Sequence, residues 1–171
     1  SKALSQALIA GLNSEGVTTV DIGLCGTEMI YFAAGQDHMG GGIMVTASHN
    51  PADYNGLKTV KEGSRPISSD TGLGAIEQET IVLMNSISMQ SAYIPTTSLH
   101  NEQSVLAGYI AKLLAMIDVA KVKPLHVLVN GGNGCAGPFF FFFWQHLPLK
   151  VTRMNHEPDG TFPNDVPNPM L

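Results

Sequence analysis

Short apolar runs that end in a glycine or a polar turn alternate along this chain with stretches whose apolar residues repeat at helical spacing. Such an alternation of strands and helices is typical of α/β layer folds. Thr27 is the predicted N-cap of the second helix, and Gly35 its stop. Strands are predicted at residues 17–22, 42–46, 56–61, 125–130 and 149–154, and helices at about 2–13, 28–34, 106–117 and 138–146, with one more ending near Asn85. The chain is therefore predicted to be α/β, with a mixed sheet sandwiched between helices.

The alternation is interrupted once, where residues 86–104 become polar and contain proline and serine without any periodicity. We interpret this segment as a linker. Residues 1–95 are then expected to form a first domain, and residues 96–171 the start of a second. Because the chain opens within a helical pattern, we also expect it to be a fragment that lacks its N-terminus.

Composition excludes several classes of function. The 171 residues are 44% hydrophobic, which is enough apolar material for a core. The net charge of −5 argues against nucleic acid or an anionic membrane as the main partner. Five of the seven phenylalanines are consecutive, Phe139 to Phe143, but this run is too short to span a bilayer and indicates no function. Cys25 and Cys135 lie in no paired ligand motif, which favours a reduced, cytoplasmic setting.

A glycine-rich turn follows the strand predicted at residues 125–130. Gly132, Gly134 and Gly137 match G-x-G-x-x-G, and Glu157 lies twenty positions further on, which is the outline of a dinucleotide-binding fingerprint. The alternative interpretation is a tight turn between strand and helix with no ligand. In the last loop, His156 and Asp159 could be metal ligands, although such residues in a loop of prolines and glycines are more often solvated turn residues.

The segment "TASHNP", Thr46 to Pro51, places a serine directly after a predicted strand. It is not a hydrolase elbow, because no G-x-S-x-G surrounds Ser48, and adjacent serine and histidine side chains do not make a triad. A phosphoryl group on Ser48 would need positive charge and N–H donors, which His49, Asn50 and Lys58 could supply. From spacing alone, Ser48 could be either a phosphoryl carrier or an ordinary residue of a polar turn.

"TASHNP" together with "DYNGLK", Asp53 to Lys58, resembles the active-site segment of the α-D-phosphohexomutase family. "VLVNGGNGCAGP" and "HEPDGTFPNDVPNPML" resemble parts of the family's second domain, whereas "GTEMIYFA" and "KEGSRPISSDTGL" are most similar to bacterial phosphomannomutases that supply GDP-mannose. The resemblance implies repeated domains of one design, of which the second is incomplete here. It also implies that the glycine turn is structural and binds no nucleotide.

The resemblance further implies a mechanism and a set of site residues. Ser48 would be carried as phosphoserine and would exchange phosphoryl groups with mannose or glucose 6-phosphate and 1-phosphate, through a hexose bisphosphate. Mg²⁺ would bind Ser48 through its phosphate, with aspartate ligands that lie outside this chain. His49 and Asn50 would line the phosphoryl site, and Lys58 would stabilise charge or act as general acid or base.

Alternatives of three kinds remain at this stage. Within the family, the activity could be that of a phosphoglucomutase or a phosphoglucosamine mutase, because the loop that reads the sugar is not part of this sequence. Outside it, the chain could be a dinucleotide-binding module centred on Gly132–Gly137, or a non-catalytic remnant. The 171-residue piece by itself is expected to be inactive, since the metal loop and the phosphate clamp of the family are missing from it.

Overall fold

The structure is a computed structural model that describes residues 2–86, 99–100, 102–164 and 168. Its helices are α1 (Lys2–Ser14), α2 (Thr27–Ala34), α3 (Leu73–Ser86), α4 (Glu102–Ala115) and α5 (Ala136–Trp144), with short 3-10 turns η1 (Glu62–Ser64), η2 (Ser69–Thr71) and η3 (Val119–Lys121). Its strands are β1 (Val20–Asp21), β2 (Gly41–Val45), β3 (Leu57–Lys61), β4 (Arg65–Pro66), β5 (Leu99–His100), β6 (His126–Asn130) and β7 (Lys150–Met154).

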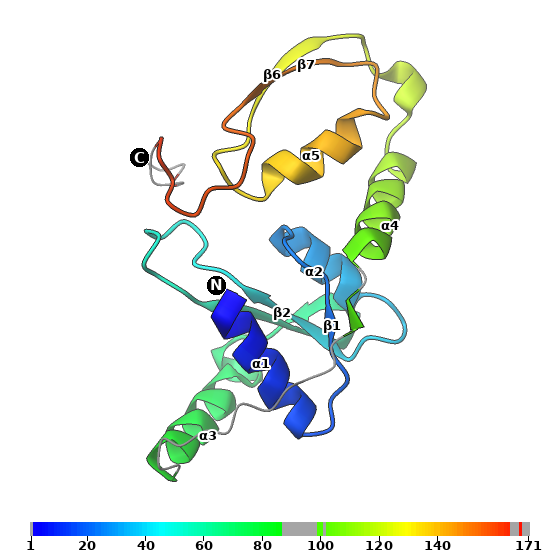
Figure 1. The fold of residues 1–171 in the computed structure, drawn as a ribbon. Coiled ribbons are helices and arrows are strands. Elements are labelled where there is room, and N and C mark those ends of the chain that lie inside the picture. The colour runs from blue at the N-terminus through cyan, green and yellow to red at the C-terminus, as the bar shows by residue number, and fades with distance from the viewer. Residues whose placement is uncertain (1, 87–98, 101, 165–167, 169–171) are drawn as a thin grey trace.

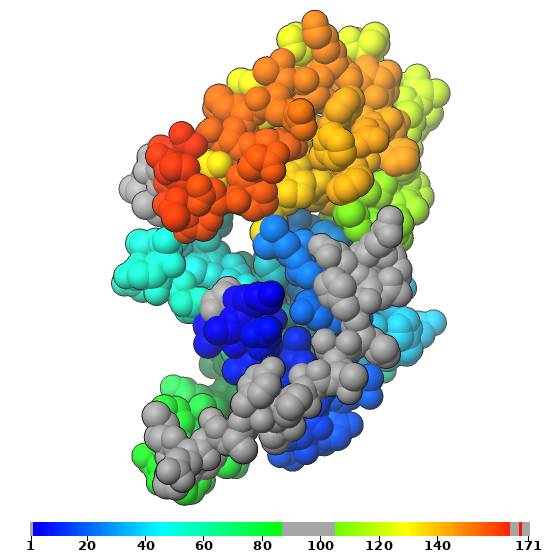
Figure 2. Space-filling view, viewed as in Figure 1, coloured from blue at the N-terminus to red at the C-terminus, as the bar shows by residue number. Residues whose placement is uncertain are grey.

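These elements form two masses that α4 connects (Figure 1). The lower mass holds the elements from α1 to α3, and the upper one holds α5, β6 and β7. The same division is visible on the surface, where the blue to green part lies below the yellow to red part (Figure 2). We call residues 2–86 the N-terminal part and residues 102–164 the C-terminal part.

The described strands pair in three small sheets. β1 pairs with β5 in parallel, β2, β3 and β4 form an antiparallel sheet, and β6 pairs with β7 in parallel. Parallel and antiparallel pairs therefore occur in one chain, with helices packed against them. The predicted α/β class is confirmed, and the pairing is distributed over several small sheets.

The core lies between α2 and the strands around it. Its buried apolar residues are Ile22, Cys25, Met29, Ile30, Ala34 and Val60, and Val105, Leu106, Tyr109 and Phe139 from the C-terminal part pack against them. Ala34 has no exposed surface. Burial of this apolar surface is the main force that holds α2 on the sheet.

Two local predictions in the N-terminal part are corrected. Thr27 is the first residue of α2 rather than its N-cap, because Gly26 occupies the cap position without a side-chain hydrogen bond. The strand predicted at residues 17–22 forms only at Val20–Asp21, since the Asp21 carboxylate accepts the N–H of Gly23 at 2.9 Å and starts a turn there.

The predicted linker and the helix after it also differ from expectation. Within residues 86–104, Leu99 and His100 form β5 and pair with β1, and α4 begins at Glu102. Residues 87–98 lie outside the described part of the chain. The domain boundary near residue 95 therefore stays a prediction.

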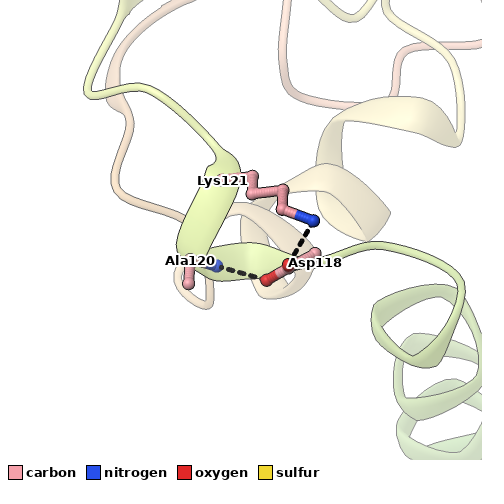
Figure 3. Close-up of polar contacts among 3 residues, drawn as sticks. All are labelled: Asp118, Ala120 and Lys121. Carbon is pink, nitrogen blue, oxygen red and sulfur yellow. Dashed lines mark hydrogen bonds and ion pairs between the residues drawn. The ribbon is translucent and has the colours of Figure 1, made fainter.

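The turn between α4 and β6 is held by one acidic side chain. Asp118 accepts the N–H of Ala120 at 3.2 Å and forms an ion pair with the Nζ atom of Lys121 at 3.1 Å (Figure 3). Both charged side chains are exposed, so this pair contributes at most about 1 kcal/mol. In the part of the chain that the structure describes, no helix combines the length and the apolar character needed to cross a bilayer.

Candidate active site

The predicted catalytic serine lies at the tip of a β-hairpin whose base is packed against α2. β2 and β3 pair antiparallel from Gly41–Lys61 to Val45–Leu57. A Cβ atom on Gly42 would lie 2.8 Å from Cγ2 of Ile30 and 3.3 Å from Cβ of Ala34. Only glycine allows this close approach, so the base of the hairpin is held tightly on the helix.

The hairpin loop, residues 46–56, is closed by short hydrogen bonds. The N–H of Thr46 donates to the carbonyl of Gly56 at 2.9 Å and extends the strand ladder by one pair. The N–H of Ser48 then donates to Oγ1 of Thr46 at 3.0 Å. Asn50 donates twice to the carbonyl of Ala47, from its backbone N–H at 3.1 Å and from Nδ2 at 2.7 Å. The side-chain amide of Asn50 has two N–H donors, so the second can still serve a phosphoryl oxygen.

Ser48 has an unusual backbone conformation for a residue with a side chain. Its φ angle is +56°, in the left-handed region that favours glycine. Holding a serine there costs about 1 kcal/mol, and such costs are concentrated at functional sites. The side chains of Ser48, His49 and Asn50 are all exposed. The loop thus presents the three residues to solvent at the end of the hairpin, which projects on the left in Figure 2.

Lys58 lies on the same hairpin, in β3, two positions after the loop. It pairs with Met44, and two residues further along Val60 pairs with Gly42. Paired residues, and residues two apart, share one face of a sheet, so Lys58 lies on the face that α2 covers at Gly42. Val60 is buried there, whereas Lys58 is exposed. The described residues therefore do not desolvate the Lys58 ammonium.

The glycine-rich turn after β6 is filled by the chain itself. Gly132 has a φ angle of +56°, and a Cβ atom on Gly137 would lie 1.8 Å from the carbonyl oxygen of His156. A Cβ atom on Gly131 would similarly lie 2.8 Å from the carbonyl oxygen of Asn155. The backbone geometry thus favours glycine at Gly132 and Gly137, two of the three motif positions. This agrees with the interpretation of the turn as structural.

A set of asparagines connects this turn to the loop after β7. Asn133 donates its backbone N–H to the carbonyl of Asn155 at 2.8 Å and its Nδ2 to the carbonyl of Glu157 at 3.0 Å. Nδ2 of Asn164 donates to Oδ1 of Asn133 at 2.8 Å and to Oδ1 of Asn155 at 3.1 Å. The N–H of Asp159 donates to the carbonyl of Asn133 at 2.8 Å. These bonds hold the loop over the turn.

Of the other candidate ligands, Asp159 holds a turn, whereas both ring nitrogens of His156 are buried without a hydrogen-bond partner among the described residues. Asp159 accepts the N–H and the hydroxyl of Thr161, at 2.9 and 2.7 Å, and these bonds lower the pKa of its carboxyl. Burial, reinforced by Glu28, raises the pKa of the Cys135 thiol, which disfavours the thiolate that a metal or a redox reaction needs. No group of three or more metal-ligating side chains occurs among the described residues.

Comparison with known proteins places this hairpin in a known domain. The family described as "Phosphoglucomutase/phosphomannomutase, alpha/beta/alpha domain I" matches residues 1–82, which include the whole hairpin. Over all 171 residues, the chain is 48% identical to the "Phosphohexose mutases" protein of Xanthomonas campestris pv. campestris. It is 43% identical to the phosphomannomutase of Vibrio cholerae.

The chain belongs to the phosphoglucomutase/phosphomannomutase family.

Solved structures of this family show the same fold. A phosphoglucomutase/phosphomannomutase family protein from Burkholderia thailandensis is 29% identical, with a TM-score of 0.74 over 98% of this chain and 36% of that one. A protein from Thermus thermophilus titled a putative phosphomannomutase gives a TM-score of 0.76 at 23% identity, over 98% of this chain and 37% of that one, which supports the fold alone. The present chain spans 37% of the length of the curated relatives from Xanthomonas and Vibrio.

Of the site residues predicted from sequence, the structure brings Ser48, His49 and Asn50 into one exposed loop and places Lys58 on the adjoining strand. Thr46, whose side chain holds the N–H of Ser48, was not singled out. Its signal was available, because a threonine two residues before the serine of a turn commonly accepts that N–H.

Proposed function

We propose that the whole protein to which this chain belongs is a phosphomannomutase-type phosphohexomutase that carries its phosphoryl group on Ser48. The observation that carries the proposal is the exposed hairpin loop, in which Ser48 is held at positive φ beside His49 and Asn50. Its sequence resembles the family's active-site segment, and it lies within the region that matches the family's first domain. Residues 1–95 and 96–171 are proposed as its first domain and as part of its second.

The reaction needs little covalent chemistry from the protein beyond the serine. In the first half, the bond from phosphorus to Oγ of Ser48 breaks while a bond from phosphorus to a hexose hydroxyl oxygen forms. The hydroxyl proton leaves to a base, and Oγ of Ser48 is protonated. In the second half, Oγ attacks the other phosphoryl group of the bisphosphate, and the sugar oxygen leaves with a proton. Lys58 is the proposed general acid or base, or a stabiliser of the phosphoryl charge.

Mg²⁺ is part of this proposal only as a partner of the Ser48 phosphate. The described residues offer no set of carboxylates around Ser48, so they do not by themselves make a magnesium site. Any further ligands would come from other residues of the whole protein.

The proposed substrate rests on the names of the related proteins and not on the structure of the hairpin. Proteins 40–48% identical to this chain are named phosphomannomutase or phosphohexose mutases. We therefore propose mannose 6-phosphate and mannose 1-phosphate as the substrate pair, with the glucose phosphates or glucosamine phosphates as alternatives. A role in supplying GDP-mannose in the cytoplasm belongs to the same proposal.

Phosphopeptide mapping of the full-length protein tests the carrier. The peptide that contains Ser48 should hold one phosphate, and after turnover with hexose monophosphate that is isotopically labelled in its phosphoryl group, the label should appear on this peptide. In Ser48→Ala the phosphopeptide should be lost, and mutase activity should fall by at least about a thousandfold.

Ser64→Ala is the matched control. Ser64 is also a serine at positive φ, 60°, but it is half-buried, donates its hydroxyl to the carbonyl of Tyr31, and lies in η1 at the other end of β3. This variant should keep both the phosphopeptide and the activity. Full mutase activity in Ser48→Ala, or a phosphate mapped to a different residue, would contradict the proposal.

A further inference from the structure

The run Phe139–Phe143 in α5 divides into two environments. Phe139 and Phe143 lie one helical turn apart and stack, with ring centroids 6.0 Å apart and planes 14° from parallel. Phe141 and Phe142 are 37% and 47% exposed and contact each other edge to face at 5.4 Å. One side of the run thus faces the interior of the protein, and the other faces solvent.

The inner side continues into two other helices. The Phe139 ring lies 5.5 Å from that of Tyr109 in α4, and the Tyr109 ring lies 5.5 Å from that of Phe32 in α2. Both pairs are tilted, by 45° and 52°, an arrangement in which aromatic pairs attract beyond simple burial. We call Phe32, Tyr109, Phe139 and Phe143 the aromatic row.

The contact between α2 and α4 in this row is closely fitted. A Cβ atom on Gly108 would lie 3.4 Å from Cζ of Phe32, so the Phe32 ring rests on the α4 backbone next to Tyr109. Nζ of Lys112, one turn further along α4, lies 5.6 Å from the centre of the same ring. A cation at this distance adds a further attraction. Phe32 therefore contacts α4 over a full helical turn.

The row connects elements that carry different parts of the molecule. Phe32 belongs to α2, the helix on which the base of the hairpin packs at Gly42. Phe139 belongs to α5, which packs beside the β6–β7 pair; there Cζ of Arg153 lies 5.7 Å from the Phe141 ring. Tyr109 and Phe139 also pack against the buried core around Met29 and Ile30.

We propose that the aromatic row is the coupling element between the two parts of the chain, so that the C-terminal part is stabilised through the core of the N-terminal part. The row is an aromatic connection from α5 across α4 to α2. Without it, β6, β7 and α5 would open more readily, because α5 and α4 would lose their ring contacts with the core around α2. This coupling does not depend on phosphoryl transfer at Ser48.

Hydrogen exchange of the full-length protein, followed by mass spectrometry, measures the coupling. Phe139→Ala should raise the exchange of β6 and β7 amides about tenfold or more, while amides of β2 and β3 change by less than about twofold. Phe139→Leu keeps most of the volume but loses the ring, and should give a smaller increase, about threefold. Phe142→Ala, in the same helix but outside the row, is the matched control and should leave all these rates within about twofold.

The distant end of the row makes the test specific. Phe32→Ala changes α2, yet it should also raise the exchange of β6 and β7. Combined with Phe139→Ala, the increase should be clearly smaller than the product of the two separate increases, because either change alone breaks the row. The proposal is overturned if the effects multiply, if Phe32→Ala acts only on the N-terminal part, or if Phe142→Ala acts like Phe139→Ala.

Discussion

The hairpin loop after β2 and the glycine turn after β6 each hold a residue other than glycine at positive φ, Ser48 and Asn133, yet they differ in what covers them. Asn133 in the turn is bound by Asn155, Glu157 and Asn164 of the following loop. Ser48 in the hairpin donates its N–H to Thr46 within the same loop, and its side chain is exposed. Backbone strain alone therefore does not distinguish a functional loop from a structural turn, whereas the surface that the chain leaves open does.

The largest expected effect concerns Lys58, on the strand that adjoins the open loop. Lys58→Met in the full-length protein should lower mutase activity about 10²- to 10⁴-fold, the usual contribution of a general acid or base. Lys58→Arg keeps the charge but cannot give up a proton near neutral pH, so it separates charge stabilisation from proton transfer. Steady-state assays measure both variants.

Lys61→Met is the control on the same strand. Lys61 donates from Nζ to the carbonyl of Thr71 at 2.6 Å, at the end of β3 far from the loop. It should retain nearly full activity. Equal losses in the Lys58 and Lys61 variants would show that the strand tolerates neither change, and would remove the special role of Lys58.

The next effect concerns the covered turn. Gly137→Ala places a Cβ atom 1.8 Å from the carbonyl oxygen of His156, so the backbone must shift, and we expect a loss of about 3 kcal/mol in the free energy of unfolding. Gly134→Ala is the matched control, because the nearest atom to its Cβ is 3.6 Å away. Urea unfolding measures both. Similar stability of the two variants would contradict the structural role of Gly137.

A smaller effect is expected at Asn133, where side chain and backbone both matter. Asn133→Ala loses two side-chain hydrogen bonds and keeps an unfavourable φ angle of +55°, so the free energy of unfolding should fall by about 2 kcal/mol. Asn133→Gly loses the same bonds but relieves the strain, and should be the more stable of the two. If the Asn133→Ala and Asn133→Gly variants have the same free energy of unfolding, backbone strain contributes nothing at this position.

The smallest effect depends on pH. Hydrogen bonds from Thr161 lower the pKa of the Asp159 carboxyl in the folded state. The unfolded state then binds more protons in the acid range, so Asp159 stabilises the fold above its ordinary pKa, near about 4, and this contribution is lost as the pH falls below it. Asp159→Asn should therefore differ from the parent in urea unfolding at pH 6 but not at about pH 2. A difference independent of pH would contradict this assignment.

Periodicity and turn chemistry were sufficient to predict the helices and most strands, because the apolar residues of α1, α4 and β6 follow the periods of those elements. The pairing of β5 with β1 was not predicted, since Leu99 and His100 carry no pattern of their own and form a strand only against a distant partner. The residues of the hairpin loop were identified by resemblance, but their exposure and the φ angle of Ser48 depend on three-dimensional structure. The aromatic row was missed for the same reason, because its members come from three helices.

Gly42 also affects how precisely the tip of the hairpin is positioned. From Gly42 to Thr46 the strand extends about 13 Å, at roughly 3.3 Å per residue. The hairpin therefore acts as a lever that pivots on Ile30 and Ala34. A tilt of about 5° at this pivot would move the tip by about 1 Å, a displacement that can slow a positioned reaction about a hundredfold. A methyl group added at residue 42, far from Ser48, would thus slow the reaction only by displacing the tip of the hairpin.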